Sequence, residues 1–160
     1  MHQNLLQLEN RIIVVSGAGG GGLGTTVTRM AARAGATVIG VSRDQANLDE
    51  HLGPLVAEGL PVILFAADVE TDEGVAAVMD CVRGTWGDLH GLVSVVGGGP
   101  PPTWGPSTRV SRVDWDSLFS KNLDSMFFIS QAVADELKEL GRPGSLVAIS
   151  HARASACRRN

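Results

Sequence analysis

A glycine-rich stretch between an apolar run and a helix-forming run constrains the fold of this chain most strongly. Residues 12–15, Ile-Ile-Val-Val, lead into Ser-Gly-Ala-Gly-Gly-Gly-Gly-Leu-Gly at 16–24, and helix-forming residues follow. Glycines let a backbone approach a pyrophosphate closely, and free amides at a helix start favour its negative charge. Gly17, Gly19 and Gly22 satisfy the spacing G-x-G-x-x-G, although a glycine-rich run meets many patterns by chance. The strand–loop–helix context favours a dinucleotide site over a flexible connecting loop.

Composition and charge exclude several classes of protein. The 160 residues are 44% hydrophobic and 19% charged, with a net charge of −4, so nucleic acid is not an expected partner. No apolar run approaches the ~20 residues that span a membrane, and the first ten residues lack the pattern of an export signal. Cys81 and Cys157 have no metal-ligand spacing and predict reduced thiols. We therefore expect a cytoplasmic protein with no metal site and no membrane partner.

Strand and helix signals alternate along the chain without an internal repeat. Short, continuous β-branched runs are typical of strands buried on both faces, which indicates a parallel sheet covered by helices. Right-handed crossovers then give a doubly wound α/β sheet of about five strands, a Rossmann-like fold. The predicted strands are 11–16, 37–41, 62–67, 91–96 and 145–150, and the predicted helices are 23–34, 45–58, 71–86 and 112–140.

Two local signals refine the predicted helices. Proline inside a helix removes a backbone donor, so Gly53-Pro54 predicts an interruption of the helix at 45–58. Ser111 followed three residues later by Asp114 predicts an N-terminal cap for the long helix. The second helix is therefore expected to break, and the long helix is expected to begin after Ser111.

Glycine or polar clusters follow four of the predicted strands. They lie at residues 17–24, 42–43, 68–69 and 97–99. In an open parallel sheet the ligand crevice lies beyond the carboxyl ends of the strands, where the strand order reverses. The four clusters therefore predict one ligand site at that edge of the sheet.

The glycine loop resembles the cofactor loop of the short-chain dehydrogenase/reductase family. Residues 16–18 and 22–24 are similar to the family's Thr-Gly-x-x-x-Gly-x-Gly pattern, with Ser in place of Thr and one extra residue. The resemblance implies an NAD(P)-dependent oxidoreductase that transfers hydride between a nicotinamide and a small carbonyl or alcohol substrate. It assigns cofactor binding in this loop to Gly17, Gly22, Leu23 and Gly24.

Two later motifs follow in the family's order. Asp68-Val69 resembles the pair that contacts adenine, and Gly97 matches the last position of an Asn-Asn-Ala-Gly motif whose other positions differ here. The resemblance implies that Asp68 and Val69 bind adenine and that Gly97 lies against the cofactor ribose. The alternatives are an Asp that serves the dipole of the following helix and a simple turn glycine.

Residues 42–44, Ser-Arg-Asp, bear on the choice of cofactor. An acidic residue about twenty positions beyond the glycines usually binds the ribose 2′-hydroxyl of NAD. Ser42 occupies that position and Arg43 follows, a pair that can accept the 2′-phosphate of NADP. Asp44 leaves NAD as the alternative, and a solvated loop charge is the alternative for Arg43.

The catalytic positions implied by the resemblance are Asn122 and Ser150. Asn122 resembles the residue that positions a proton-relay water, and Ser150 ends a strand similar to the one before the family's catalytic serine. That serine often stands one position later, where this chain has His151, so Ser150 requires a shifted register. An exposed helical Asn is the alternative for Asn122.

The resemblance covers about residues 8–150, the first three fifths of a usual family member. The chain has no tyrosine, so the family's Tyr-x-x-x-Lys motif is missing. We expect a truncated family member with a partial dinucleotide-binding domain at 1–150 and an atypical tail at 151–160. An exposed edge strand and the family's helix pairing predict a homo-oligomer. The alternatives to an active enzyme are a non-catalytic dinucleotide-binding module and an inactive fragment.

Overall fold

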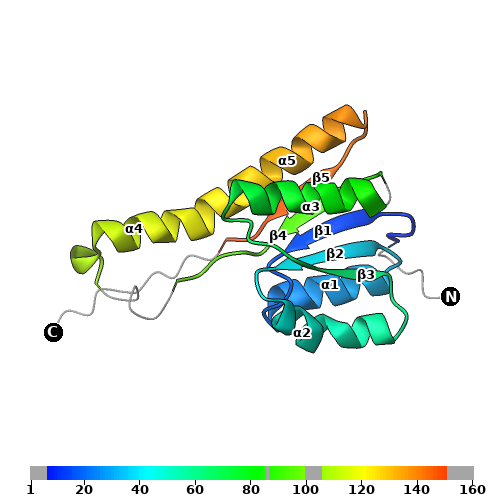
Figure 1. Cartoon of the computed structure of the whole chain (residues 1–160), viewed down its shortest axis with the longest axis horizontal. Helices are drawn as coiled ribbons and strands as arrows, with labels where there is room; N and C mark the ends of the chain where they lie inside the picture. Colours follow the sequence, from blue (N-terminus) through cyan, green and yellow to red (C-terminus); the bar gives the residue numbers. More distant parts are fainter. Residues whose placement is uncertain (1–6, 86, 100–105, 151–160) are drawn as a thin grey trace.

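The computed structural model describes residues 7–85, 87–99 and 106–150, and its strands form one sheet (Figure 1). The order is β3-β2-β1-β4-β5, and every neighbouring pair is parallel. The predicted α/β sheet of five parallel strands is confirmed. The strands are β1 (Ile12–Ser16), β2 (Thr37–Ser42), β3 (Val62–Ala66), β4 (Gly91–Ser94) and β5 (Ser145–Ala148).

Helices cover both faces of the sheet (Figure 1). Helices α1 (Leu23–Arg33) and α2 (Gln45–Ala57) lie on one face, and α3 (Asp72–Thr85) lies with the long helix on the other. That long helix begins after the short 3-10 turn η2. Its parts are α4 (Arg112–Phe119), the π-helical segment η3 (Ser120–Asp124) and α5 (Ser125–Glu139), and η2 spans Ser107–Arg109.

The core forms two layers, one on each side of the sheet. Val14 and Val15 are both fully buried, but they point to opposite faces because side chains alternate along a strand. Val14 belongs to the cluster that contains Val78 of α3, and Val15 belongs to the cluster that contains Leu52 of α2. Burial of β1 on both faces agrees with its continuous apolar sequence.

Helix α2 runs without a break through Pro54, so the predicted interruption is wrong. Pro54 removes one amide donor from the helix, yet Leu52 and Leu55 on either side are almost completely buried. Their packing against the sheet outweighs the lost hydrogen bond. The predicted cap of the long helix is confirmed, because the Ser111 hydroxyl accepts from the Asp114 amide at 3.1 Å.

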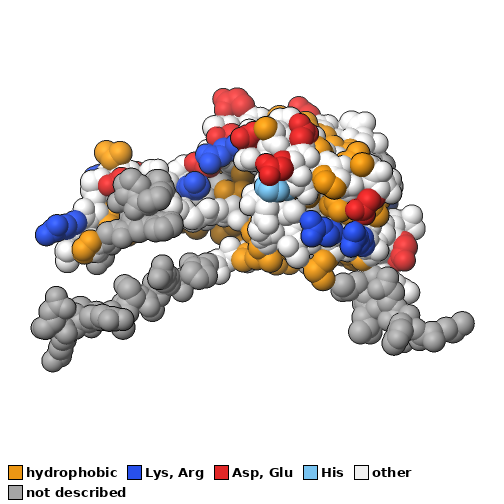
Figure 2. Space-filling model, turned by 90° about the horizontal axis from the view of Figure 1, so that it is seen from below, with side chains coloured by type: hydrophobic (Ala, Val, Ile, Leu, Met, Phe, Trp, Pro, Cys, Tyr) orange, Lys and Arg blue, Asp and Glu red, His pale blue; other side chains and the backbone are white. Residues whose placement is uncertain are grey.

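The far edge of the sheet and the start of the long helix are poorly covered. Leu146 and Val147 of β5 are 41% and 46% exposed, and α4 has no buried residue. Helix α4 projects from the body of the molecule (Figure 1), and in Figure 2 it forms an arm that carries hydrophobic side chains. None of the helices in the described ranges is both long and apolar enough to cross a lipid bilayer.

Candidate functional site

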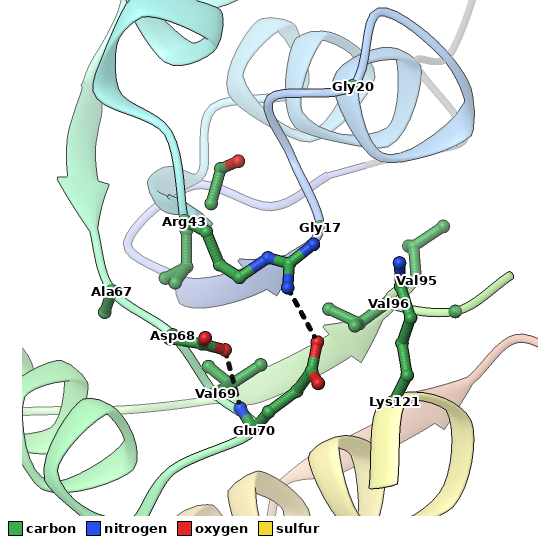
Figure 3. A pocket seen from close by; sticks show the side chains of 13 residues that line it. Gly17, Gly20, Arg43, Ala67, Asp68, Val69, Glu70, Val95, Val96 and Lys121 are labelled. Atoms are coloured by element: carbon green, nitrogen blue, oxygen red, sulfur yellow. Dashed lines mark hydrogen bonds and ion pairs between the residues drawn. The ribbon is translucent and has the colours of Figure 1, made fainter. Parts of the chain in front are cut away.

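A cavity of about 290 Å³ lies where the strands of the sheet end (Figure 3). It joins loops that follow β1, β2, β3 and β4, as the four sequence clusters predict. Six of the predicted cofactor-binding residues line it, together with residues that the sequence did not single out. The lining residues are Gly17, Gly20, Val41, Ser42, Arg43, Ala67, Asp68, Val69, Glu70, Val95, Val96, Gly97 and Lys121.

Gly17 ties the glycine loop to the strands on both sides of β1. Its φ is +84°, in the left-handed region that favours glycine. Its amide donates to the carbonyl of Val41 at 2.9 Å. A Cβ at this position would lie 3.0 Å from the amide nitrogen of Val96. Only glycine therefore fits between the ends of β2 and β4 without strain.

The start of α1 packs directly behind this loop. The Thr25 hydroxyl donates to the Ala18 carbonyl at 2.6 Å and accepts from the Gly21 amide at 3.0 Å. A Cβ on Gly24 would overlap the Gly17 carbonyl oxygen. The first turn of α1 carries no acidic side chain, so nothing there repels an anion. Gly22, Leu23 and Gly24 form this turn and do not line the cavity.

The extra residue in the loop is accommodated by contacts with β2 and α2. A Cβ on Gly19 would lie 2.8 Å from the Ser42 hydroxyl oxygen. Gly21 has a φ of +69°, and a Cβ there would lie 3.0 Å from the imidazole of His51. The longer loop is thus packed against Ser42 and His51. No sequence signal identified His51, because its place beside the loop depends on how α2 crosses the sheet.

Arg43 and Glu70 form an ion pair at the cavity, with 3.0 Å between Nη1 and Oε1. Figure 3 shows the two side chains extending toward one another, with Lys121 beside Val96 on the other side. Glu70 belongs to none of the motifs from which the sequence predicts a site. The available signal was an acid two residues beyond Asp68, in the same loop.

Asp68 shapes the loop after β3. Its Oδ1 accepts from the Glu70 amide at 3.0 Å, while its carbonyl accepts from Thr71. The Thr71 hydroxyl accepts from the Gly74 amide at 3.1 Å and so caps α3. Capping of α3 is therefore performed by Thr71, and the Asp68 side chain lines the cavity in a turn.

Asn122 fastens the long helix to the loop after β4. Its Oδ1 accepts from the Gly98 amide at 2.7 Å, and its Nδ2 donates to the carbonyls of Gly98 at 2.9 Å and Leu118 at 2.8 Å. It lies in the π-helical segment η3, and such segments are frequent at functional sites. A Cβ on Gly97 would lie 2.9 Å from the same Oδ1. Asn122 thus holds the loop after β4, which includes the lining residue Gly97, without lining the cavity itself.

Ser150 is exposed and follows β5 at the same edge of the sheet as the cavity. The neighbouring Ile149 amide donates to the Ser94 carbonyl at 3.0 Å, which extends the pairing with β4. Ser150 does not line the cavity. His151 and the predicted tail lie outside the described residues. Within the described ranges, no three His, Cys, Asp or Glu side chains are grouped as metal ligands.

Sequence comparison finds relatives along most of the chain. A profile of the family described as short chain dehydrogenase matches residues 11–156. Gluconate 5-dehydrogenase of Gluconobacter oxydans is 32% identical over 157 residues, which are 98% of this chain and 59% of that protein. A tropinone reductase homolog of Arabidopsis thaliana is 35% identical over 144 residues, 89% of this chain and 52% of that protein.

Solved structures agree with these matches. A short-chain type dehydrogenase/reductase from Mycobacterium ulcerans superimposes with a TM-score of 0.82 at 29% identity, over 91% of this chain and 52% of that one. A gluconate 5-dehydrogenase from Burkholderia cenocepacia, in complex with NADP and tartrate, gives 0.77 at 26% identity, over 89% and 54%. The chain thus spans little more than half the length of the relatives that it matches. It belongs to the short-chain dehydrogenase/reductase family.

Proposed function

We propose that the cavity binds NADP, and that the chain is part of an oxidoreductase acting on a small carbonyl or alcohol substrate. The observation that carries this proposal is that the glycine loop, Arg43, Asp68 and Gly97 all line one cavity. A family relative whose structure is described as a complex with NADP supports it. NAD is the alternative cofactor.

The residues present suit a phosphorylated dinucleotide. Gly20 of the same loop lines the cavity. Just beyond it, the amides of Gly22, Leu23 and Gly24 at the start of α1 would hold the pyrophosphate, since no acidic side chain stands in that turn. Ser42 and Arg43 would hold a 2′-phosphate, because a guanidinium offers paired donors to phosphate oxygens.

The remaining cofactor contacts come from the loops after β3 and β4. Asp68 and Val69 would contact the adenine, where the Asp carboxylate can accept from the exocyclic amine. Gly97 would lie against the ribose, since it has no side chain to hinder close approach. All three residues line the cavity.

The catalytic roles that we propose concern Asn122 and Ser150. When bound, the nicotinamide ring supplies or accepts the hydride. Ser150 would donate a hydrogen bond to the substrate oxygen, and Asn122 would position the loop and a water near it. Asn122 already uses both side-chain polar atoms in contacts with Gly98 and Leu118.

A second candidate function is a dinucleotide-binding module without turnover. The 160 residues contain no tyrosine, whereas the family's proton transfer uses one. This candidate predicts cofactor binding without hydride transfer. An inactive fragment would bind neither cofactor.

We also propose that the chain forms a homo-oligomer in the cytoplasm through its long helix. Exposed aromatic and aliphatic side chains lie along this helix, and such clusters mark association surfaces in soluble proteins. Size-exclusion chromatography with light scattering tests this, and a sharp monomer at micromolar concentration would contradict it. The exposed side chains are Val113, Trp115, Phe119, Leu123, Phe127 and Phe128.

Thermal shift of the purified chain with NADP and with NAD tests the cofactor proposal. Binding stabilises the folded state by about 2.7 kcal/mol at a hundredfold excess of ligand over Kd. We expect a larger shift with NADP, and Arg43→Ala should remove most of that difference. Arg33→Ala is a matched control, because Arg33 also pairs with a glutamate but lies outside the cavity. No shift with either cofactor from a folded sample would overturn the proposal.

A further inference from the structure

We propose that Glu70 competes with the 2′-phosphate of NADP for Arg43 and thereby sets the preference between NADP and NAD. This inference rests on the proposed function, because it concerns the same cavity. It begins from the ion pair of 3.0 Å that already engages the Arg43 guanidinium. A phosphate that binds to this guanidinium must compete with the Glu70 carboxylate.

Glu70 is the better-fixed partner of the pair. Its side chain is 20% exposed, against 55% for Arg43. Its backbone amide is held by Asp68 in the turn after β3, and the next residue, Thr71, caps α3. The backbone that carries Glu70 is therefore fixed on both sides of the residue. Arg43 is a longer side chain on the rim and is the partner that must move.

The two anions bind to the same guanidinium. A guanidinium binds a carboxylate or a phosphate through the same planar set of N–H groups. NADP must therefore either displace Glu70 from Arg43 or place its 2′-phosphate close to the carboxylate. Displacement loses the existing ion pair, and close approach brings two like charges together in a site partly shielded from water, so both cost free energy.

NAD does not meet this penalty. Its ribose carries a neutral 2′-hydroxyl, which can donate to a carboxylate and needs no guanidinium. Glu70 therefore lowers the affinity for NADP and does not oppose the binding of NAD.

The other charges on the cavity wall do not relieve the competition. Arg43 and Lys121 are balanced by Asp68 and Glu70 among the described lining residues. Their formal charges sum to zero, two positive and two negative, and Glu70→Gln would leave one positive charge. Lys121 lies beside Val96, on the other side of the cavity from the ion pair (Figure 3).

Calorimetric titration with two small probes tests the inference without any catalytic readout. Adenosine 2′,5′-bisphosphate and adenosine 5′-monophosphate differ only by the 2′-phosphate. At low salt, where surface charges are least screened, Glu70→Gln should tighten the bisphosphate about threefold to tenfold and the monophosphate less than about twofold. Glu58→Gln is the control, because it breaks a comparable Arg–Glu pair outside the cavity.

A double variant separates competition from a general charge effect. In an Arg43→Gln background, Glu70→Gln should change the ratio of the two affinities much less than in the native chain. Glu70→Ala carries the same expectation and replaces Glu70→Gln if that variant does not fold.

The outcomes distinguish the two proposals. An unchanged ratio in Glu70→Gln, or a ratio shifted toward the monophosphate, overturns the competition. If the folded native chain and its variants bind neither probe, the proposed NADP site itself is overturned, and the inference with it.

Discussion

Strands β2 and β5 have similar apolar sequences but opposite surroundings. In β2, Val38 and Ile39 are completely buried, whereas Leu146 and Val147 of β5 are 41% and 46% exposed. Strand β2 pairs on both edges, and β5 pairs only with β4. A β-branched run therefore predicts a strand, but its burial depends on what the rest of the chain places over it.

The difference extends to the two halves of the molecule. The closed half consists of β1, β2 and β3 with α1 and α2, and it carries the glycine loop and Arg43. The open half consists of β5 and α4, and Ser150 follows β5. A second cavity of about 470 Å³ is lined by residues of β1, β4 and β5. Apolar residues form much of its wall. They include Leu8, Ile13, Leu92, Val93 and Val147.

The largest expected contrast between the halves comes from two matched leucine substitutions. Leu52→Ala in the closed half should cost about 2–5 kcal/mol of unfolding free energy, because Leu52 is completely buried. Leu146→Ala in the open half should cost less than about 1 kcal/mol, because 41% of Leu146 is already exposed. Urea denaturation measures both. Equal losses would mean that β5 is covered in solution, for example by a second copy.

Within the closed half, Gly24→Ala should disrupt the glycine loop. The added Cβ would overlap the Gly17 carbonyl, and such overpacking costs about 1–3 kcal/mol. NADP binding should weaken together with stability. Gly20→Ala is the control for stability, since no atom lies within 4 Å of its added Cβ. If the two variants were equally stable, the tight packing of α1 behind the loop would be refuted.

The Arg83–Glu136 ion pair joins α3 to α5, the helices on the face of the sheet opposite α1 and α2 (Figure 1). Glu136 has a side-chain exposure of 7%, and its Oε2 lies 2.7 Å from Arg83. The hydrogen bond and then the charge of Glu136 raise the pKa of Arg83. Glu136→Ala should cost about 1–2 kcal/mol, less than a fully buried pair, because half of Arg83 is exposed.

Glu139→Ala is the control for this pair, because Glu139 is an exposed glutamate on the same helix whose charge also raises the pKa of Arg83, but less than Glu136 does. We expect it to cost less than about 0.5 kcal/mol in the same thermal or urea unfolding experiment. If Glu139→Ala lost as much unfolding free energy as Glu136→Ala, the loss would come from the negative charge of the helix and not from the ion pair with Arg83.

The smallest expected effect tests whether α2 is continuous through Pro54. Gly53→Ala should stabilise the chain by about 0.5–1 kcal/mol, since Ala is the better helix former and nothing lies within 4 Å of its Cβ. Gly59→Ala should instead destabilise it by about 1 kcal/mol, because Gly59 has a φ of +80°. A loss of stability in Gly53→Ala would indicate that the helix breaks there.

Local sequence determined the kinds of elements and the edge at which the site forms. Continuous apolar runs, glycine loops and amphipathic runs report on neighbours within a few residues, so strands and helices were predicted within about two residues of their observed ends. The clusters after the strands predicted the cavity, because all carboxyl ends of a parallel sheet meet at one edge. Ser111 was recognised as a cap for the same local reason.

Contacts between distant segments were decided only by the tertiary structure. Glu70 meets Arg43 across 27 positions, and Asn122 meets Gly98 across 24. His51 reaches the glycine loop only because α2 crosses beside it. Pro54 is tolerated because neighbouring leucines are buried, and β5 is exposed because little of the described chain packs over its faces, whereas β3 adjoins one strand too and is better covered. Each outcome depends on the free energy of packing between elements, which no short window of sequence contains.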